Sequence, residues 1–280
     1  HFHNAESLAI YETSLLAWFR FHVPPEKNLA ILTPPPSAAP NSSLVHMFDT
    51  IRRNFGAPES SFLGTLGDDG SWALNFEATV SALENSCRSD EGIVLLGTAF
   101  SFVHLLDYLA AKNLRFQLPP DSRVMETGGY KNRSRVLPKS ELHALITARL
   151  GVPPSHILCE YGMSELSSQA YDNAAGAGTA RAEGREPASA AHKAGASDHP
   201  SSVIRHFQFP PWVRAQIVSP ETGREVRDGE TGLLRIFDVA NVFSALAIQT
   251  EDLAIRRGAA FELLGRAELA EPRGCSLMTA

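Results

Sequence analysis

Residues 156–168 read HILCEYGMSELSS, and in them an apolar run passes directly into an aromatic residue, a glycine, hydroxyls and a carboxylate. This pattern indicates a buried strand that ends in a polar loop, and open α/β sheets bind ligands at the carboxyl ends of their strands. Ser164 and Glu165 suit a nucleotide phosphate and its Mg²⁺, because Mg²⁺ takes one or two carboxylates plus phosphate oxygens. An ordinary strand-to-helix turn capped by Ser164 explains the stretch equally well.

Upstream of this stretch, apolar runs alternate with helix patterns. The runs at 28–33, 92–97 and 123–126 are apolar on both faces, as buried parallel strands are. Helices are predicted from Asn4, from Ser42 or Ser43 to Gly56, over 76–88, over 98–112 and from Pro138 or Ser140. Strands that alternate with helices predict a parallel sheet covered by helices.

The composition changes after the opening stretch. Residues 173–202 are rich in Ala, Gly and Ser without periodicity, which predicts a flexible surface insertion. Short apolar runs separated by turn signals then follow at 212–218, 232–237, 245–249 and 260–264. They predict a small antiparallel barrel or sheet. The expected fold is therefore α/β, a mostly parallel sheet flanked by helices (1–172), the insertion (173–202) and a smaller antiparallel β subdomain (203–280).

Charge and composition exclude several classes of protein. The net charge of −6 disfavours nucleic-acid binding, which normally needs a basic field. The three cysteines, Cys87, Cys159 and Cys275, are few and widely spaced, so we expect no disulfide framework or zinc site and a cytoplasmic location. No apolar run approaches the roughly 20 residues of a membrane span, and no signal peptide is visible. The chain begins at His1 without a methionine, which suggests a fragment.

Other polar clusters accompany the opening stretch. Residues 126–131, ETGGYK, place two glycines and an aromatic residue after a predicted strand, where backbone can approach a flat ligand. Asp252, after a predicted strand, can accept both hydroxyls of a ribose, and Arg266 can reach a phosphate or ribose. Each cluster is also explained by a plain surface turn. Lys131, Arg133 and Arg135 are either anion contacts or a solvated face, and Cys275 beside Arg273 is either a reactive thiol or incidental.

A serine hydrolase is a further candidate, because Gly162-Met163-Ser164 begins like the nucleophile elbow G-x-S-x-G. Leu166 stands where the elbow needs its second glycine, which argues against this interpretation. Several histidines fall in helix and strand patterns and are interpreted as structural: His46, His104, His143 and His156. His104 is the histidine with a position near a substrate pocket.

The order of these pieces resembles the adenylate-forming enzyme superfamily. The order is a Gly-Gly loop, Tyr-Gly-Met-Ser-Glu, the turn 229–232, Thr-Glu-Asp-Leu and then Gly-Arg. Within the superfamily, the stretches 126–131, 160–169 and 271–277 are similar to the acyl-protein synthetase family, the fatty-acid:protein ligases of bacterial bioluminescence. This resemblance implies that ATP activates a fatty acid as an acyl-adenylate, and that the acyl group then passes to a thiol.

The resemblance also implies a role for each candidate residue. Gly128, Gly129 and Tyr130 would line the adenine and acyl pocket, with Tyr161 and Gly162 against adenine. Ser164 would meet the phosphates, Glu165 would hold Mg²⁺, Asp252 would bind the ribose hydroxyls, and Arg266 would contact ribose or phosphate. Cys275 matches the family's acyl-carrying cysteine by position, and an acyl-acceptor or reductase protein is the implied partner.

The sequence departs from the superfamily pattern in two places. The Ser/Thr/Gly-rich phosphate loop is absent, and in relatives it lies upstream of the position of His1. The mobile carboxyl-terminal domain with its catalytic lysine is absent too, with Lys131 as a possible substitute. An acyl- or aryl-CoA ligase and a catalytically incomplete nucleotide- or acyl-binding module are the alternative functions.

Overall fold

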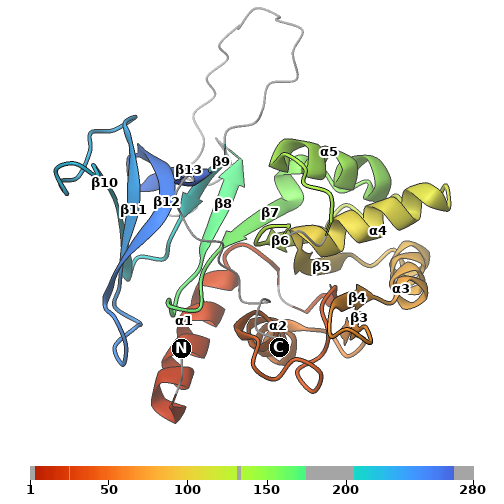
Figure 1. The fold of residues 1–280 in the computed structure, drawn as a ribbon. Coiled ribbons are helices and arrows are strands. Elements are labelled where there is room, and N and C mark those ends of the chain that lie inside the picture. Colours follow the sequence, from red (N-terminus) through yellow and green to blue (C-terminus); the bar gives the residue numbers. More distant parts are fainter. Residues whose placement is uncertain (1–3, 25, 131–133, 175–204, 268–280) are drawn as a thin grey trace, which may run out of the picture.

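A computed structural model describes residues 4–24, 26–130, 134–174 and 205–267 of the chain (Figure 1). Its described helices are α1 (Ala5–Phe19), α2 (Ser43–Phe55), α3 (Phe76–Ser89), α4 (Ala99–Ala111) and α5 (Lys139–Leu150), with a short 3-10 turn at Pro154–His156. Four helices begin at residues whose side chains accept a hydrogen bond from the first turn: Asn4, Ser42, Asn75 and Thr98. The predicted caps at Asn4 and Ser42 are confirmed. Such caps satisfy backbone donors that would otherwise be unpaired. None of these helices is long and apolar enough to cross a membrane.

Five parallel strands form the part of the sheet against which the helices pack. They are β1 (Asn28–Ile31), β2 (Ser61–Phe62), β5 (Ile93–Thr98), β6 (Arg123–Thr127) and β7 (Ile157–Tyr161), in the order β7-β6-β5-β1-β2. Each predicted parallel strand is confirmed within a residue or two. Between β2 and α3, the strands β3 (Gly64–Leu66) and β4 (Trp72–Leu74) pair as a separate hairpin.

The antiparallel strands continue the same sheet beyond β7. They are β8 (Ala170–Ala174), β9 (Arg205–Gln208), β10 (Val213–Val218), β11 (Thr231–Asp238), β12 (Ala247–Arg257) and β13 (Ala260–Arg266), in the order β10-β11-β12-β13-β9-β8. The predicted fold class is confirmed: a parallel sheet flanked by helices and a smaller antiparallel part. Strands β8 and β9, which join the two parts, were not predicted. β12 is longer than predicted, so Asp252 lies inside a strand, beside a register shift at Leu253, rather than in a turn.

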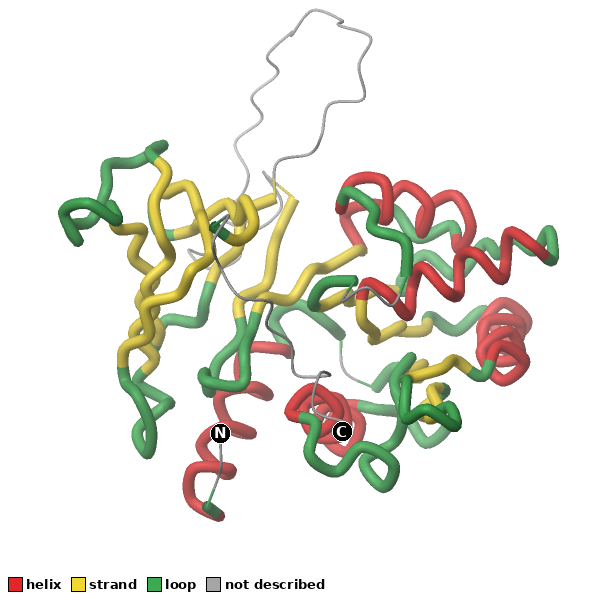
Figure 2. The backbone as a smooth tube through the Cα atoms, in the orientation of Figure 1, coloured by secondary structure: helices red, strands yellow, loops and turns green. Residues whose placement is uncertain are grey.

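Helices cover both faces of the parallel strands (Figures 1 and 2). Alternate residues of β5 point to opposite faces, as a strand requires. Ile93 and Leu95 pack in the cluster formed with α4 and α5, whereas Val94 and Leu96 pack in the cluster formed with α1 and α2. A third cluster fills the antiparallel part, around Phe207, Phe261 and Ile236. The carboxyl ends of the parallel strands therefore rest on a core that is packed on both sides.

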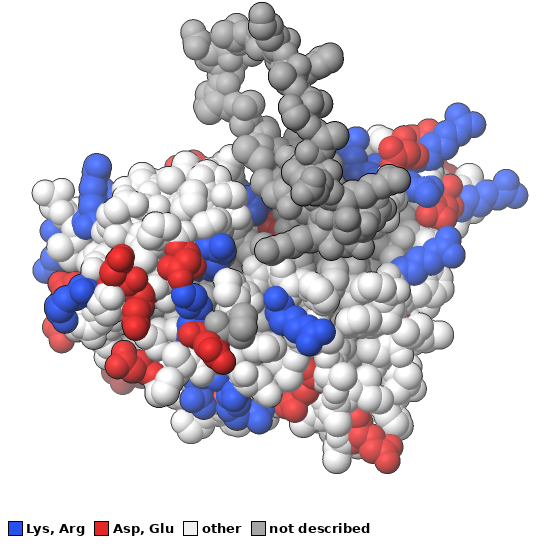
Figure 3. Space-filling model, turned by 180° about the vertical axis from the view of Figure 1, so that it is seen from behind, with Lys and Arg blue, Asp and Glu red and all other residues white. Residues whose placement is uncertain are grey.

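Acidic and basic side chains are interspersed on the rear face of the molecule, so the part coloured there shows no extended field of one sign (Figure 3).

Candidate active site

The loops that follow β6 and β7 leave the sheet side by side. The two strands are parallel neighbours, with Thr127 opposite Glu160 at the end of the ladder. Gly128 has φ of +68°, a left-handed conformation that favours glycine. Gly129 has open space around it, and Tyr130 packs against the core beneath α4 and α5. The structure therefore brings the predicted 128–130 and 161–165 segments to one edge of the sheet.

Tyr161 links this edge to the antiparallel part. Its hydroxyl donates a hydrogen bond of 2.7 Å to Asp252 Oδ2, across 91 residues of sequence. Its ring meets Phe207, Phe209 and Phe261 edge to face, with centroids 5.9 to 6.2 Å apart. Burial, with Asp252 beside it, raises the pKa of Tyr161 far above its ordinary value, so the phenol stays protonated. The ring is thus a fixed, neutral surface next to a carboxylate.

Arg266 lies opposite Asp252 in the β12–β13 ladder. Its guanidinium pairs with Glu251, and its Nε lies 3.9 Å from Asp252 Oδ1. This Nε is buried and has no hydrogen-bond partner within the described ranges. A buried donor without a partner is costly, so this atom suits an acceptor supplied by a ligand. Tyr161, Asp252 and Arg266, predicted separately, therefore form one group with the chemistry to hold a ribose.

Ser164 and Glu165 lie at the tip of the loop after β7. Glu165 is exposed, and its Oε2 accepts a hydrogen bond of 3.3 Å from the Ser164 hydroxyl. A carboxylate has about four acceptor positions, so Glu165 retains oxygen lone pairs for a metal ion. The described residues contain no preformed group of three or more His, Cys, Asp or Glu side chains that would hold a metal.

Buried hydrogen bonds fix the rest of this loop. Asp238 accepts from the Ser167 backbone N–H at 3.0 Å and from the Ser168 hydroxyl at 2.9 Å. Asn241 accepts from the Ser167 hydroxyl at 3.1 Å and donates to the Glu165 carbonyl at 2.8 Å. The Ser164 hydroxyl contacts Glu165, and no histidine of the described chain hydrogen-bonds to it. Because a serine nucleophile needs an adjacent base, this geometry also opposes the hydrolase interpretation.

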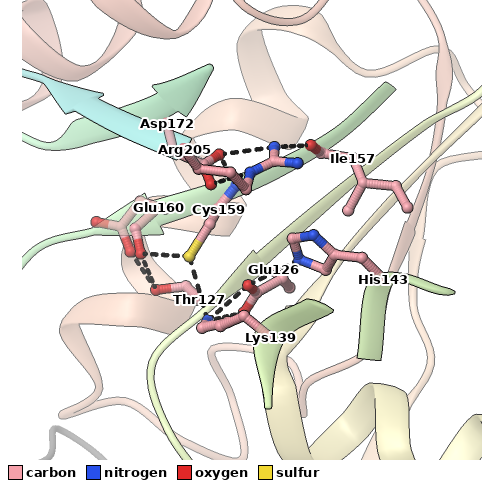
Figure 4. Close-up of polar contacts among 9 residues, drawn as sticks. All are labelled: Glu126, Thr127, Lys139, His143, Ile157, Cys159, Glu160, Asp172 and Arg205. Atoms are coloured by element: carbon pink, nitrogen blue, oxygen red, sulfur yellow. Dashed lines mark hydrogen bonds and ion pairs between the residues drawn. The ribbon is translucent and has the colours of Figure 1, made fainter. Parts of the chain in front are cut away.

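An ionic cluster forms around the buried Glu126 carboxylate of β6, with the partly exposed Lys139 as its cation (Figure 4). Lys139, at the start of α5, places its ammonium 2.5 and 2.6 Å from the two oxygens of Glu126 and 3.2 Å from Cys159 Sγ. His143, one turn later, has Nε2 3.2 Å from Glu126 Oε1. Burial alone raises the pKa of Glu126, but Lys139 and His143 outweigh it and lower this pKa to about 2. Burial likewise raises the pKa of the Cys159 thiol well above its ordinary value.

Glu160 ends β7 in different surroundings. Its side chain is buried, and its Oε2 accepts a short hydrogen bond from the Thr127 hydroxyl (Figure 4). Burial raises the pKa of Glu160 to about 7, with the nearby Glu126 charge adding to the effect. Gly162 lies directly over it: a Cβ at that position would be 2.3 Å from Glu160 Oε1. The loop after β7 therefore folds across a buried carboxyl whose pKa is raised.

Other residues singled out in the sequence lie elsewhere. Arg135 is exposed and pairs with Asp107 at 2.8 Å, and the His104 ring meets Phe100 edge to face. Cys275, Lys131 and Arg133 fall outside the described residues, as does nearly all of the predicted insertion. Their predicted roles stay predictions.

Sequence reasoning missed the polar residues that meet around the ends of β6 and β7. Glu126 and Glu160 were quoted within motifs without a role, and Thr127, Lys139, His143 and Cys159 received none. A signal existed, because a glutamate at the end of an otherwise apolar strand is unusual unless it is paired. Lys139 and His143 are also four residues apart on one helix, and such residues share a face.

The chain is similar in sequence to proteins of a known family. The family profile described as "Acyl-protein synthetase, LuxE" matches residues 29–177. Two curated relatives carry the name long-chain-fatty-acid--luciferin-component ligase. The one from Aliivibrio fischeri is 24% identical over 219 residues, 74% of this chain and 50% of the relative. The one from Vibrio harveyi is 24% identical over 213 residues, 73% of this chain and 49% of the relative. The chain thus spans about half the length of the curated relatives it matches.

Solved structures share the fold at low sequence identity. ATP-bound MatB from Rhodopseudomonas palustris superposes with a TM-score of 0.54 at 16% identity, covering 93% of this chain and 44% of that one. The adenylation domain of a keto acid-selecting NRPS module, bound to a keto acyl adenylate, has a TM-score of 0.56 at 17% identity. That match covers 94% of this chain and 48% of the other.

Proposed function

Because the chain belongs to the LuxE family of acyl-protein synthetases, we propose that the full-length protein activates a fatty acid with ATP and transfers the acyl group to a cysteine thiol. The carboxylate of the acid attacks the α-phosphate of ATP, which releases pyrophosphate and leaves an acyl-adenylate. A thiolate then attacks the acyl carbon, AMP leaves, and a thioester remains. The observation that carries this proposal is the group formed by Tyr161, Asp252 and Arg266 at the end of β7, the strand next to β6.

In this proposal each group near the edge of the sheet has one task. Asp252 accepts hydrogen bonds from the ribose hydroxyls, and Arg266 donates to the ribose or a phosphate. The aromatic face of Tyr161 lies against adenine, with Gly162 giving the backbone close approach. Gly128, Gly129 and Tyr130 line the pocket where adenine and the acyl chain meet.

Ser164 donates to the phosphates, and Glu165 holds Mg²⁺, which when bound offsets phosphate charge. Catalysis in such a site rests on positioning and on charge stabilisation, because the two reacting groups are both anions. Cys275 is the proposed acyl carrier on this chain, and a separate acceptor or reductase protein is the proposed consumer of the thioester.

The test is fatty-acid-dependent exchange of labelled pyrophosphate into ATP by the full-length protein. We expect exchange in the wild type and a KM for ATP raised on the order of tenfold in Asp252→Asn, since hydrogen bonds to a charged group contribute about 1.5–3 kcal/mol. Asp49→Asn is the matched control: Asp49 is also in arginine pairs, but with Arg52 and Arg53 on α2. Absence of exchange with every fatty acid tested contradicts the proposal.

A second measurement separates protein acylation from a coenzyme A ligase. Labelled fatty acid should attach to the protein through a hydroxylamine-sensitive bond, and Cys275→Ser should abolish the attachment while pyrophosphate exchange continues. Thioester formed on added coenzyme A, with none on protein, would instead assign the ligase activity.

A further inference from the structure

Thr127 and Glu160 connect the bases of the two candidate loops. They face each other in the last pair of the β6–β7 ladder, and the Thr127 hydroxyl donates to Glu160 Oε2. Thr127 immediately precedes Gly128, and Glu160 immediately precedes Tyr161. A change in this contact therefore acts on both loops at their points of departure from the sheet.

The contact has little freedom to rearrange. Thr127 is 5% exposed and Glu160 6%, and Gly162 closes over the Glu160 carboxyl. Among the described residues, the Thr127 hydroxyl is the only side-chain group that donates a hydrogen bond to the Glu160 carboxyl. Buried polar groups hold such partners strongly, because losing the partner leaves the group unsatisfied.

We infer that Thr127 and Glu160 are positioning residues, which hold the loop 128–130 and the loop 161–165 at a fixed separation for acyl-adenylate formation. The inference rests on the proposed function. In that reaction the acyl chain meets adenine along the loop 128–130, and adenine and the phosphates lie along the loop 161–165, so the alignment of acid and nucleotide depends on the loops' separation. A misplacement of about 1 Å at reacting groups can cost on the order of a hundredfold in rate.

Several charged or titratable groups surround the Glu160 carboxyl. The charges of Glu126, on β6, and Lys139, on α5, both act on this carboxyl. Cys159 precedes Glu160 on β7, and Tyr171 lies opposite Glu160 on β8. Tyr161 follows Glu160 and donates a hydrogen bond to Asp252. Burial raises the pKa of Glu160 to about 7, so the group ionises near neutral pH. The ionised form adds negative charge beneath loops that receive two anionic substrates. We therefore expect KM for the acid and for ATP to rise between pH about 6 and about 8.

The kinetic experiment compares Thr127→Val, Thr127→Ser and Glu160→Gln in the full-length protein, with kcat and KM for pyrophosphate exchange measured separately across this pH range. Thr50→Val is the matched control, because the Thr50 hydroxyl also contacts a glutamate, Glu12 at 3.2 Å, but between α1 and α2. Thr127→Val should lower kcat/KM on the order of tenfold to a hundredfold. Thr127→Ser should restore most of it, and Glu160→Gln should remove the pH-dependent rise in KM. Wild-type kinetics in Thr127→Val, or a rise in KM that persists in Glu160→Gln, overturns the inference.

Amide hydrogen exchange tests the link without relying on activity. Thr127→Val should increase exchange in both 128–130 and 161–165, on the order of tenfold, while β1 and β5 keep wild-type protection. Thr50→Val should leave both loops unchanged. Unchanged amide hydrogen exchange in either loop of Thr127→Val overturns the inference, whether or not the wild type is active. Absence of pyrophosphate exchange in the wild type counts against the proposed function instead.

Discussion

The ends of β6 and β7 each contain a buried glutamate, and the two side chains have opposite electrostatic surroundings. Glu126, with no exposed surface, receives the Lys139 ammonium on both oxygens and the His143 ring on one. Glu160, one strand away, receives the Thr127 hydroxyl. The pKa of the first carboxyl falls to about 2 and that of the second rises to about 7. Equal burial thus gives a permanent anion in one place and a titratable acid in the other, and the presence of a cation decides which.

The largest effect should come from removing that cation. Lys139→Met leaves the Glu126 carboxylate, which has no exposed surface, beside His143 alone, and leaving a buried charge without its partner typically costs about 3–5 kcal/mol. We therefore expect the free energy of unfolding, measured by urea titration at neutral pH, to fall by about that amount. The double variant Lys139→Met/Glu126→Gln should recover part of the loss, because it no longer leaves a charge unpaired.

Arg135→Ala is the matched control for Lys139→Met. Arg135 lies four residues earlier and is about as exposed as Lys139, but its partner Asp107 is half exposed whereas Glu126 has no exposed surface. Exposed pairs contribute about 0–1 kcal/mol, so this variant should lose little stability. Equal losses of stability in the two variants would mean that burial of the Glu126 carboxylate does not distinguish its ion pair from a surface pair.

The dependence of stability on pH should separate the two glutamates next. The folded-state pKa of Glu160 lies above its ordinary value of 4.5, so the native state binds this proton more tightly than the unfolded chain does. Stability from Glu160 is then complete below pH 4.5 and is lost as the pH rises to about 7. Glu126 has the opposite sign: its contribution is complete above pH 4.5 and is lost as the pH falls toward 2. Each contribution is on the order of 3 kcal/mol, at about 1.4 kcal/mol per pH unit of displacement.

Urea titrations of wild type and Glu160→Gln across this range check the prediction. The stability of Glu160→Gln relative to wild type should increase from acidic to neutral pH, because the variant has no charge to bury. Parallel curves for the two proteins would show that Glu160 titrates as an ordinary glutamate. Thr50→Val should change the level of its own curve and leave its shape unaltered.

The sequence predicted the parts of this comparison that local patterns control. Apolar runs located β5, β6 and β7, and Asn4 and Ser42 marked helix starts, because strand burial and helix capping depend on neighbouring residues. The same patterns brought Gly128 and Tyr161 to one edge, since parallel strands share their carboxyl ends.

Contacts between distant segments could not be predicted in the same way. Residues 170–174 read AYDNA, and this strand buries Asp172 because Arg205, on β9, pairs with it. The bond from Tyr161 to Asp252 likewise joins two strands that are far apart in sequence. Glu126 and Glu160 look alike in sequence, and their difference arises only when the start of α5 docks Lys139 against β6.

The smallest expected effect on stability comes from adding a methyl group at Gly162, next to the Glu160 carboxyl. Gly162 has no left-handed φ, so alanine is allowed by the backbone, and the only obstacle is its Cβ, which would lie 2.3 Å from Glu160 Oε1. The carboxyl end can rotate in part, so Gly162→Ala should cost about 1 kcal/mol, at the low end of overpacking penalties. Gly129→Ala is the control in the facing loop, because a Cβ there meets open space; it should change stability by less than about 0.5 kcal/mol.

The Gly162→Ala variant also connects sterics to titration. Rotation of the carboxyl weakens its contact with Thr127, and this hydrogen bond, together with the Lys139 charge, lowers the pKa of Glu160 against the effect of burial. The pH range over which Glu160 affects stability should therefore move upward in Gly162→Ala and stay in place in Gly129→Ala. An unmoved range, despite lost stability, would mean that the loop rather than the carboxyl yields to the added methyl group.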